Sequence, residues 1–280
     1  MGPILAATDL SARSDRALRR AAKLAKHTGA ELHIVHILDD DLPGAILQRR
    51  TEETEAELTA LVAADPDLSA ANPRVDVETG QLSRFLPRLA QERGAGLVVF
   101  GSHRDRGLAE LIGSPTLSRV MKALNAPLMI VVGPVEREHA KALAGWDFSP
   151  ASQAAVTLAQ TLAPIDTLTL LHAWADPLAG APYAMDIAGA ATPARQAGIE
   201  DALAETKAQL AADAPGIAVE TEAMIGSPAR ALTQAAEEKG SDLLIIGRHA
   251  RTGIARFLLG ETAERVALTA PCDVLIAPPA

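Results

Sequence analysis

The chain has 280 residues, 48% hydrophobic and only 2% aromatic, which is enough for two domains with cores of Ala, Leu, Val and Ile. Its net charge of −9 argues against nucleic acid or an anionic membrane as a partner. No run approaches the roughly 20 apolar residues that span a bilayer, and the start lacks a signal-peptide pattern. The single cysteine, Cys272, excludes an internal disulfide, so we expect a cytoplasmic protein.

Strands and helices alternate along the first half of the chain. Ser11 and Gly29 are residue types that begin and end helices, and Asp65-Pro66 breaks a helical pattern. The pattern predicts strands at 3–8, 31–37, 74–78, 97–100 and 128–132, and helices at 12–28, 46–64, 82–93 and 114–124.

The same order returns in the second half. It predicts strands at 143–146, 168–173, 217–220, 243–246 and 274–277, and helices at 150–162, 195–212, 227–239 and 262–268. The segment Trp174–Pro193 is rich in Ala, Gly and Pro. We expect it to be a loop, either a mobile lid or a plain surface connection.

An internal duplication explains the repeated order. Residues 80–120 and 226–266 align without gaps at an offset of 146, with 14 identities in 41 positions that include matched glycines. The sequence therefore predicts two tandem α/β domains, 1–134 and 135–280, each a doubly wound, Rossmann- or flavodoxin-like parallel sheet of five strands. Ligands of such sheets bind at the carboxyl ends of the strands, where the strand order reverses.

One segment in each half has the pattern of an anion site. Residues 97–103 and 243–249 each read as a buried strand that runs into a loop with glycines and then a helix. Backbone N–H groups and the positive end of the helix then surround one point, where a negative group can bind.

Several motifs follow one another in the same order in the two halves, some of them in one half only. They are Asp9 with Ser11, Asp147 with Ser149, His36 and His172 in the second strands, Gly226-Ser227-Pro228-Ala229, Gly247 to Gly260, Ala126-Pro127, and Ala270-Pro271-Cys272. Together they resemble the universal stress protein family in its tandem form, over essentially the whole chain.

The resemblance implies a nucleotide site. ATP-binding members carry G-x-x-G, nine residues, then G-S or G-T, whose amides and hydroxyl hold the phosphates. The Asp that ends strand one and the backbone after strand two hold adenine. These roles fall on Asp9, Ile37, Gly101, Gly113 and Ser114 in the first half, and on Asp147, Ala173, Gly247 and Gly260 in the second.

The first half departs from that pattern in two places. Arg104 stands where the second glycine is expected, and Gly113 follows Gly101 by 12 residues in place of 13. Ser114 and Gly113 can still contact an anion, and Arg104 or Arg106 can add a charge-assisted hydrogen bond. We therefore expect a weakened site for ATP, with Mg²⁺ accompanying it.

The second half departs further. Ala250 replaces a glycine, and Glu261 replaces the Ser or Thr. At a separation of about 4–5 Å and an effective dielectric near 20, the repulsion between a carboxylate and a phosphate costs about 3–4 kcal/mol. The carboxylate would itself interact with the helix end. We expect this site to be degenerate and the second half to be mainly structural.

Other polar residues have two interpretations. His103 and His249 follow strand four in both copies, so each either contacts a ligand or meets a shared structural need. Asp9 and Asp147 could simply cap the next turn, and His36 and His172 could simply pack. We expect no metal site, because the run Asp39-Asp40-Asp41 is of a kind that is usually solvated.

No catalytic motif is present, neither a Walker loop nor G-x-S-x-G, H-E-x-x-H or C-x-x-C. We expect a non-enzymatic stress protein that binds a small ligand. A pure interaction module, a carrier of an apolar molecule and slow ATP hydrolysis stay open as alternatives. By the resemblance, the halves pack as a pseudo-dimer with Leu128–Val132 beside Val274–Ala277, and the chain could also form a homodimer.

Overall fold

The computed structural model describes residues 1–41, 43–101, 115–136, 138–174, 184–248 and 260–278. Its strands are β1 Ile4–Thr8, β2 Leu32–Leu38, β3 Arg74–Thr79, β4 Leu97–Gly101, β5 Leu128–Val131, β6 Lys141–Gly145, β7 Thr167–Trp174, β8 Ala218–Ile225, β9 Leu243–Gly247 and β10 Asp273–Ala277. They form a ten-stranded sheet in the order β3-β2-β1-β4-β5-β10-β9-β6-β7-β8. Each half contributes five parallel strands, which confirms the predicted α/β fold class.

Helices cover both faces of this sheet. They are α1 Ala12–Thr28, α2 Gly44–Ala64, α3 Pro66–Ala71, α4 Leu82–Glu92, α5 Pro115–Ala123, α6 Pro150–Leu162, α7 Ala184–Asp213, α8 Pro228–Glu238 and α9 Glu261–Thr269. The helices α1, α2, α3, α6 and α7 pack on one face, and α4, α5, α8 and α9 on the other. Because both faces are covered, the inner strands consist mainly of buried aliphatic residues. The edge strands β3 and β8 are more polar and are mostly half-buried or exposed.

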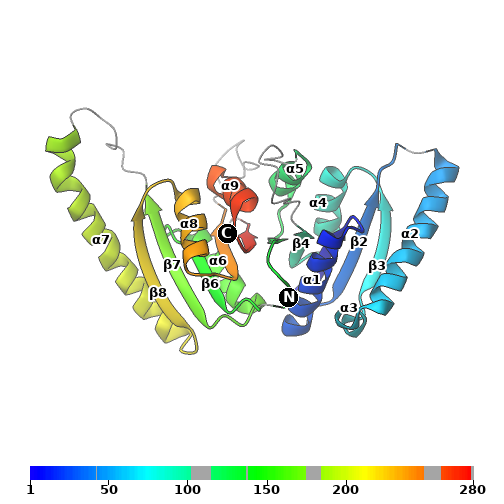
Figure 1. The fold of residues 1–280 in the computed structure, drawn as a ribbon, viewed down its shortest axis with the longest axis horizontal. Helices are drawn as coiled ribbons and strands as arrows, with labels where there is room; N and C mark the ends of the chain where they lie inside the picture. The colour runs from blue at the N-terminus through cyan, green and yellow to red at the C-terminus, as the bar shows by residue number, and fades with distance from the viewer. Residues whose placement is uncertain (42, 102–114, 137, 175–183, 249–259, 279–280) are drawn as a thin grey trace.

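The two halves meet at β5 and β10, which pair antiparallel. Met129 faces Leu275 at the centre of the pairing, and these positions differ by the same 146 residues that relate the two sequence copies. The junction is therefore close to a twofold axis, and Figure 1 shows the halves spreading from it to α7 and α2 at the outer edges. The expected pairing of the fifth strands is confirmed.

Local signals placed most helix ends correctly. Ser11 has extended backbone and accepts a hydrogen bond from the Ser14 amide at 3.4 Å, and Gly29 ends α1 at φ +69°. Ser149 caps α6 in the same way, accepting from the Ser152 amide at 3.2 Å. The side chain of a capping Ser satisfies an N–H that has no partner within the helix.

Two local expectations were wrong. Residues 184–193, expected to be loop, form the first turns of α7, because the high helix propensity of the many alanines outweighs the Gly and Pro. The rest of that expected loop, 175–183, lies outside the described residues. The helix α3 was missed: Asp65 both ends α2 and caps α3, accepting from the amides of Asp67 and Leu68 at 3.0 and 3.2 Å.

A buried ionic cluster ties the halves together beside the β5–β10 pair. Asp273, fully buried, accepts hydrogen bonds from the amides of Val132 and Gly133, both at 2.7 Å. Its other oxygen lies 2.8 Å from His139 Nε2 and 2.9 Å from Arg20 Nε. Burial alone would raise the pKa of Asp273, but the hydrogen bond from His139 and the charges of His139 and Arg20 hold that pKa below its ordinary value. None of the helices in the described part of the chain is both long and apolar enough to span a bilayer.

Candidate functional site

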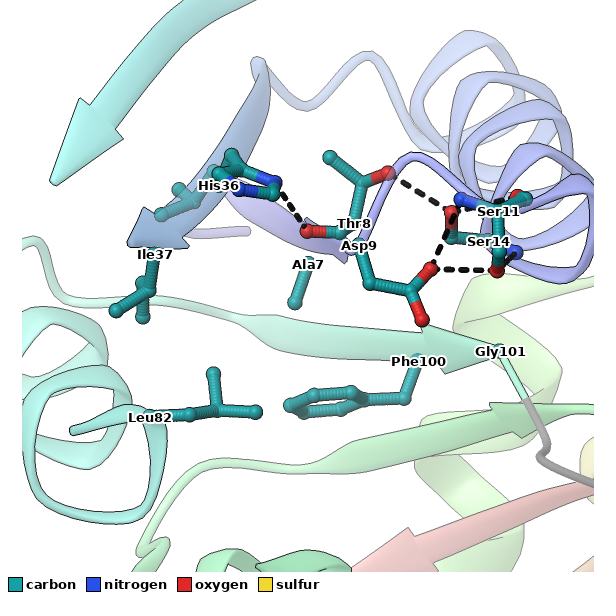
Figure 2. A pocket seen from close by; sticks show the side chains of 11 residues that line it. Ala7, Thr8, Asp9, Ser11, Ser14, His36, Ile37, Leu82, Phe100 and Gly101 are labelled. Carbon is teal, nitrogen blue, oxygen red and sulfur yellow. Dashed lines mark hydrogen bonds between the residues drawn. The ribbon is translucent and has the colours of Figure 1, made fainter. Parts of the chain in front are cut away.

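A cleft opens at the carboxyl ends of β1, β2 and β4 in the first half, where the strand order reverses. Figure 2 shows its lining, with the carboxylate of Asp9 in the turn after β1 and the ring of Phe100 on the neighbouring strand β4. Its volume is about 120 Å³. The lining residues are Ala7, Thr8, Asp9, Ser11, Ser14, Val35, His36, Ile37, Leu82, Phe100 and Gly101. The cleft thus brings together Asp9, Ile37 and Gly101, three of the predicted site residues.

The turn after β1 explains why Asp9 is followed by Ser11. Asp9 Oδ1 accepts hydrogen bonds from the Ser11 amide at 3.0 Å and the Ser11 hydroxyl at 2.5 Å. Leu10, between them, has a φ of +60°, and its amide donates to Thr8 Oγ1 at 3.0 Å. A bulky residue with positive φ is uncommon, so these bonds hold a strained turn. Asp9 therefore has the structural role considered from the sequence, and it is also exposed at the cleft.

His36 has a packing role. Its Nδ1 lies 2.9 Å from the Thr8 carbonyl oxygen, so Nδ1–H donates to that oxygen. Burial lowers the pKa of His36, only partly offset by this hydrogen bond and by nearby carboxylates. The hydrogen bond to Thr8 therefore fixes the His36 ring against β1.

The carboxylates of Asp39, Asp40 and Asp41, all exposed, lie within 4.8 Å of one another.

The second half has a larger cleft at the ends of β6, β7 and β9, of about 470 Å³. Its lining is Gly145, Trp146, Asp147, Ser152, Leu171, Ala173, Pro228, Leu232, Ile246, Gly247, Arg248, Gly260, Glu261, Thr262 and Ala263. Five predicted residues of the second site therefore converge here. Asp147 Oδ1 accepts from the Ser149 amide at 3.1 Å and its hydroxyl at 2.5 Å, with Phe148 at φ +62°, so the turn of the first half is repeated.

Gly247 is required by packing. A Cβ at this position would lie 2.4 Å from the Ala151 carbonyl oxygen and 2.8 Å from the Ser152 amide nitrogen, in the first turn of α6. The family resemblance offers Gly247 as a phosphate contact; in the structure, the close approach of two backbones by itself excludes any side chain here.

Glu261 is the first residue of α9, with a side chain that is 82% exposed. Its carboxylate lies 3.3 Å from Arg265 Nε, one turn further along α9. The preceding residue, Gly260, provides no side-chain cap. The Glu261 carboxylate thus lies at the start of α9, as the sequence predicts, and it pairs with Arg265 on the surface of that helix.

An aromatic cluster borders the second cleft. Trp146, Phe148, His172 and Trp174 lie in a row, with neighbouring ring centroids 6.4, 5.1 and 5.9 Å apart. His172 Nδ1–H donates to the Trp146 carbonyl oxygen at 2.7 Å, as His36 does to Thr8. His172 therefore also has a packing role. The first half has Thr8 and Leu10 in place of Trp146 and Phe148, so this cluster distinguishes the second half.

Several predicted residues lie outside the described part of the chain. They are His103, Arg104, Gly113 and Ser114 in the first half and His249 in the second. Sequence reasoning also missed residues. Leu82 and Phe100 gave no signal beyond being apolar, whereas Asp273 did give one, because a carboxylate inside an apolar strand is rare without a partner. Arg248 was read only as part of a repeated motif.

These features define a duplicated α/β protein with a cleft at the strand ends of each half. A model of the Universal stress protein family matches residues 1–132 and again 139–278. The chain therefore belongs to the universal stress protein family, in its tandem form.

Known relatives and structures agree with this assignment. Universal stress protein Rv2623 of Mycobacterium tuberculosis is 28% identical, over 98% of this chain and 95% of its own length. A universal stress protein structure from Archaeoglobus fulgidus superimposes with a TM-score of 0.73 at 18% identity, covering 99% of this chain and 96% of that one. One from Pseudomonas aeruginosa gives 0.65 at 20% identity, covering 100% and 94%. At these identities, the two structures show the fold alone.

Proposed function

We propose that this protein is a non-enzymatic stress-response protein of the cytoplasm that binds an adenine nucleotide, ATP, in its first cleft. The observation that supports the proposal is the convergence of Asp9, Ile37 and Gly101 on one cleft. The family resemblance assigns adenine to the first two positions and phosphate to the third. Three separate strands supply them, so their meeting depends on the fold.

The shape of the first cleft suits the base of a nucleotide. Its walls include the apolar side chains of Ile37, Leu82 and Phe100, while Asp9 supplies hydrogen-bond acceptors at the rim. Its volume of about 120 Å³ is smaller than the roughly 300–1,000 Å³ of pockets that hold entire drug-sized ligands. The volume of the first cleft therefore suits the adenine ring of a nucleotide and not the entire nucleotide.

The phosphates would extend beyond this volume. The contacts proposed for them are Gly113 and Ser114, with His103 and Arg104 beside them; these four assignments rest on the sequence. Mg²⁺ would bind the phosphate oxygens and keep several of its waters.

The second cleft supports a different occupant. Glu261 at the start of α9 opposes a phosphate there, whereas the volume of about 470 Å³ and walls of Leu171, Leu232 and Ile246 suit a neutral or apolar molecule. A carrier function for the second half is therefore the second candidate.

Titration calorimetry with ATP, ADP and AMP, with and without Mg²⁺, tests the nucleotide proposal. We expect one ATP per chain. Ser114→Glu should weaken ATP binding more than 100-fold, because a carboxylate beside each phosphate costs about 3–4 kcal/mol. Asp147→Asn, in the second cleft, is the matched control and should leave ATP binding unchanged. Undiminished ATP binding by Ser114→Glu would contradict the proposed site.

Native mass spectrometry of the purified chain tests the carrier candidate. A co-purified apolar molecule that is lost when Leu232→Glu fills the second cleft would support it. Bound nucleotide without any other ligand would favour the first cleft alone.

A further inference from the structure

Arg248 links the second cleft to a helix of the first half. It follows β9 directly and lines the second cleft. Its Nη1 donates to the Met121 carbonyl oxygen at 2.8 Å, and its Nη2 to the Leu124 carbonyl oxygen at 2.7 Å. Met121 is in the last turn of α5 and Leu124 directly follows the helix, so a side chain of the second half caps the carboxyl end of a helix of the first.

The two bonds are well placed to stabilise α5. The last carbonyls of a helix have no partner within it, and a cation there also interacts favourably with the helix dipole. Burial lowers the pKa of Arg248, which indicates a poorly hydrated guanidinium. Hydrogen bonds in such surroundings are less weakened by competition from water.

A second contact holds the middle of the same helix. The Ser118 hydroxyl donates to Glu264 Oε1 at 2.5 Å, and Lys122 Nζ lies 3.4 Å from Glu264 Oε2. Glu264 lies on α9, one turn after Glu261. Side chains that flank the second cleft therefore contact α5 at its middle and at its carboxyl end.

The opposite end of α5 begins at Pro115, which in the sequence directly follows Ser114, one of the proposed phosphate contacts. A nine-residue helix is only marginally stable on its own, so its contacts with the second half, together with its buried residues Val120 and Met121, fix its position. We propose that Arg248 is a positioning residue for the first cleft, which aims the amino end of α5 at the phosphates of the bound nucleotide. This inference rests on the proposed ATP site. It gives the second half a function that requires no nucleotide of its own.

Comparing ATP with adenosine separates positioning from general loss of structure, since adenosine has no phosphates. Arg248→Met should weaken ATP binding about tenfold or more and leave adenosine binding within about twofold. Arg248→Lys keeps one donor and the charge and should recover part of the loss, and it serves if Arg248→Met does not fold. Arg265→Met removes a cation from α9 that pairs with Glu261 and should change neither affinity. Unchanged ATP affinity in Arg248→Met, or an equal loss for both ligands, would overturn the inference.

Hydrogen exchange of the full chain without ligand tests the anchoring itself. Amides of α5 should exchange faster in Arg248→Met than in the wild type, while those of β2 and α1 stay unchanged. If the wild type binds no ATP, the proposed function fails, and this measurement still decides the role of Arg248. Unchanged exchange in α5 would exclude it.

Discussion

The two clefts share the framework around them and differ in what faces the ligand space. Both follow a strained turn in which an Asp accepts two hydrogen bonds from a Ser. The first is about 120 Å³ with Asp9 at its rim, and the second is about 470 Å³ with Arg248 and Glu261 in its wall. The duplication has thus kept what the fold requires and changed what a ligand would meet.

Residues that both copies share therefore do not distinguish the functions of the two clefts. His36 and His172 both donate to a backbone carbonyl of the neighbouring strand, and Asp9 and Asp147 both hold a turn. Structural need alone explains why they occur twice. The residues that differ between the copies, above all Ser114 against Glu261, limit the ATP proposal to the first cleft.

The junction is asymmetric as well. At the offset of 146 residues, Asp273 corresponds to Pro127 and Arg248 to Ser102. The second half therefore supplies side-chain ties for which the first half has no equivalent residue. The predictions below test this difference between the halves, beginning with the largest expected effect.

Asp273→Asn should lower the free energy of unfolding by about 3–5 kcal/mol, because it leaves Arg20 buried without its counter-charge. Urea denaturation of the full chain measures this. The control is Asp201→Asn on the exposed side of α7, which should stay within about 0.5 kcal/mol. A similarly small effect for Asp273→Asn would show that the ionic cluster does not tie the halves.

The same carboxylate predicts an acid sensitivity. Its pKa in the folded chain is below the ordinary 3.8, so its stabilisation is present above that value and is lost as the pH falls through the folded-state pKa. Unfolding curves between about pH 5 and pH 2 should therefore show a steeper loss of stability for the wild type than for Asp273→Asn. Parallel pH profiles would contradict this.

Gly247→Ala should cost about 1–3 kcal/mol, because the new Cβ forces apart β9 and the first turn of α6. Gly198→Ala in α7, where nothing lies within 4 Å, is the matched control and should stabilise by about 0.5–1 kcal/mol. Thermal unfolding of both variants measures the difference. A neutral Gly247→Ala would mean that this contact does not explain the glycine.

Ser11→Ala and Ser149→Ala should each cost about 1 kcal/mol, since each removes a helix cap and a bond to the preceding Asp. Equal losses in denaturant titrations would support the equivalence of the two turns. Clearly unequal losses of stability would show that one turn contributes more to the free energy of unfolding than the other. They would also identify the half in which the turn has diverged.

The smallest expected effect concerns Cys272, whose thiol should not react with a thiol reagent in the folded chain. Burial, with the charge of Asp273 beside it, raises the pKa of this thiol to about 12, so little thiolate exists at neutral pH. A thiol reagent at pH 8 should label the unfolded chain and leave the folded chain unlabelled. Rapid labelling of the folded chain would show that the junction at β10 opens.

The sequence by itself determined the alternation of strands and helices, the duplication, the caps at Ser11, Gly29 and Ser149, and the family. These depend on neighbours a few residues apart, or on comparing the two copies. Local patterns failed where propensities conflict, as in residues 184–193, and where one residue has two roles, as Asp65 does between α2 and α3.

Only the tertiary structure decided the rest. It placed Gly247 against Ala151, Asp273 against Arg20, and Arg248 against the end of α5. It also set the unequal volumes of the two clefts. These contacts join residues about 100 to 250 positions apart, so no local pattern encodes them. The contacts of Asp273 and Arg248 exist because β5 and β10 pair and bring the two halves side by side, whereas Gly247 meets Ala151 within the second half, where β9 pairs with β6.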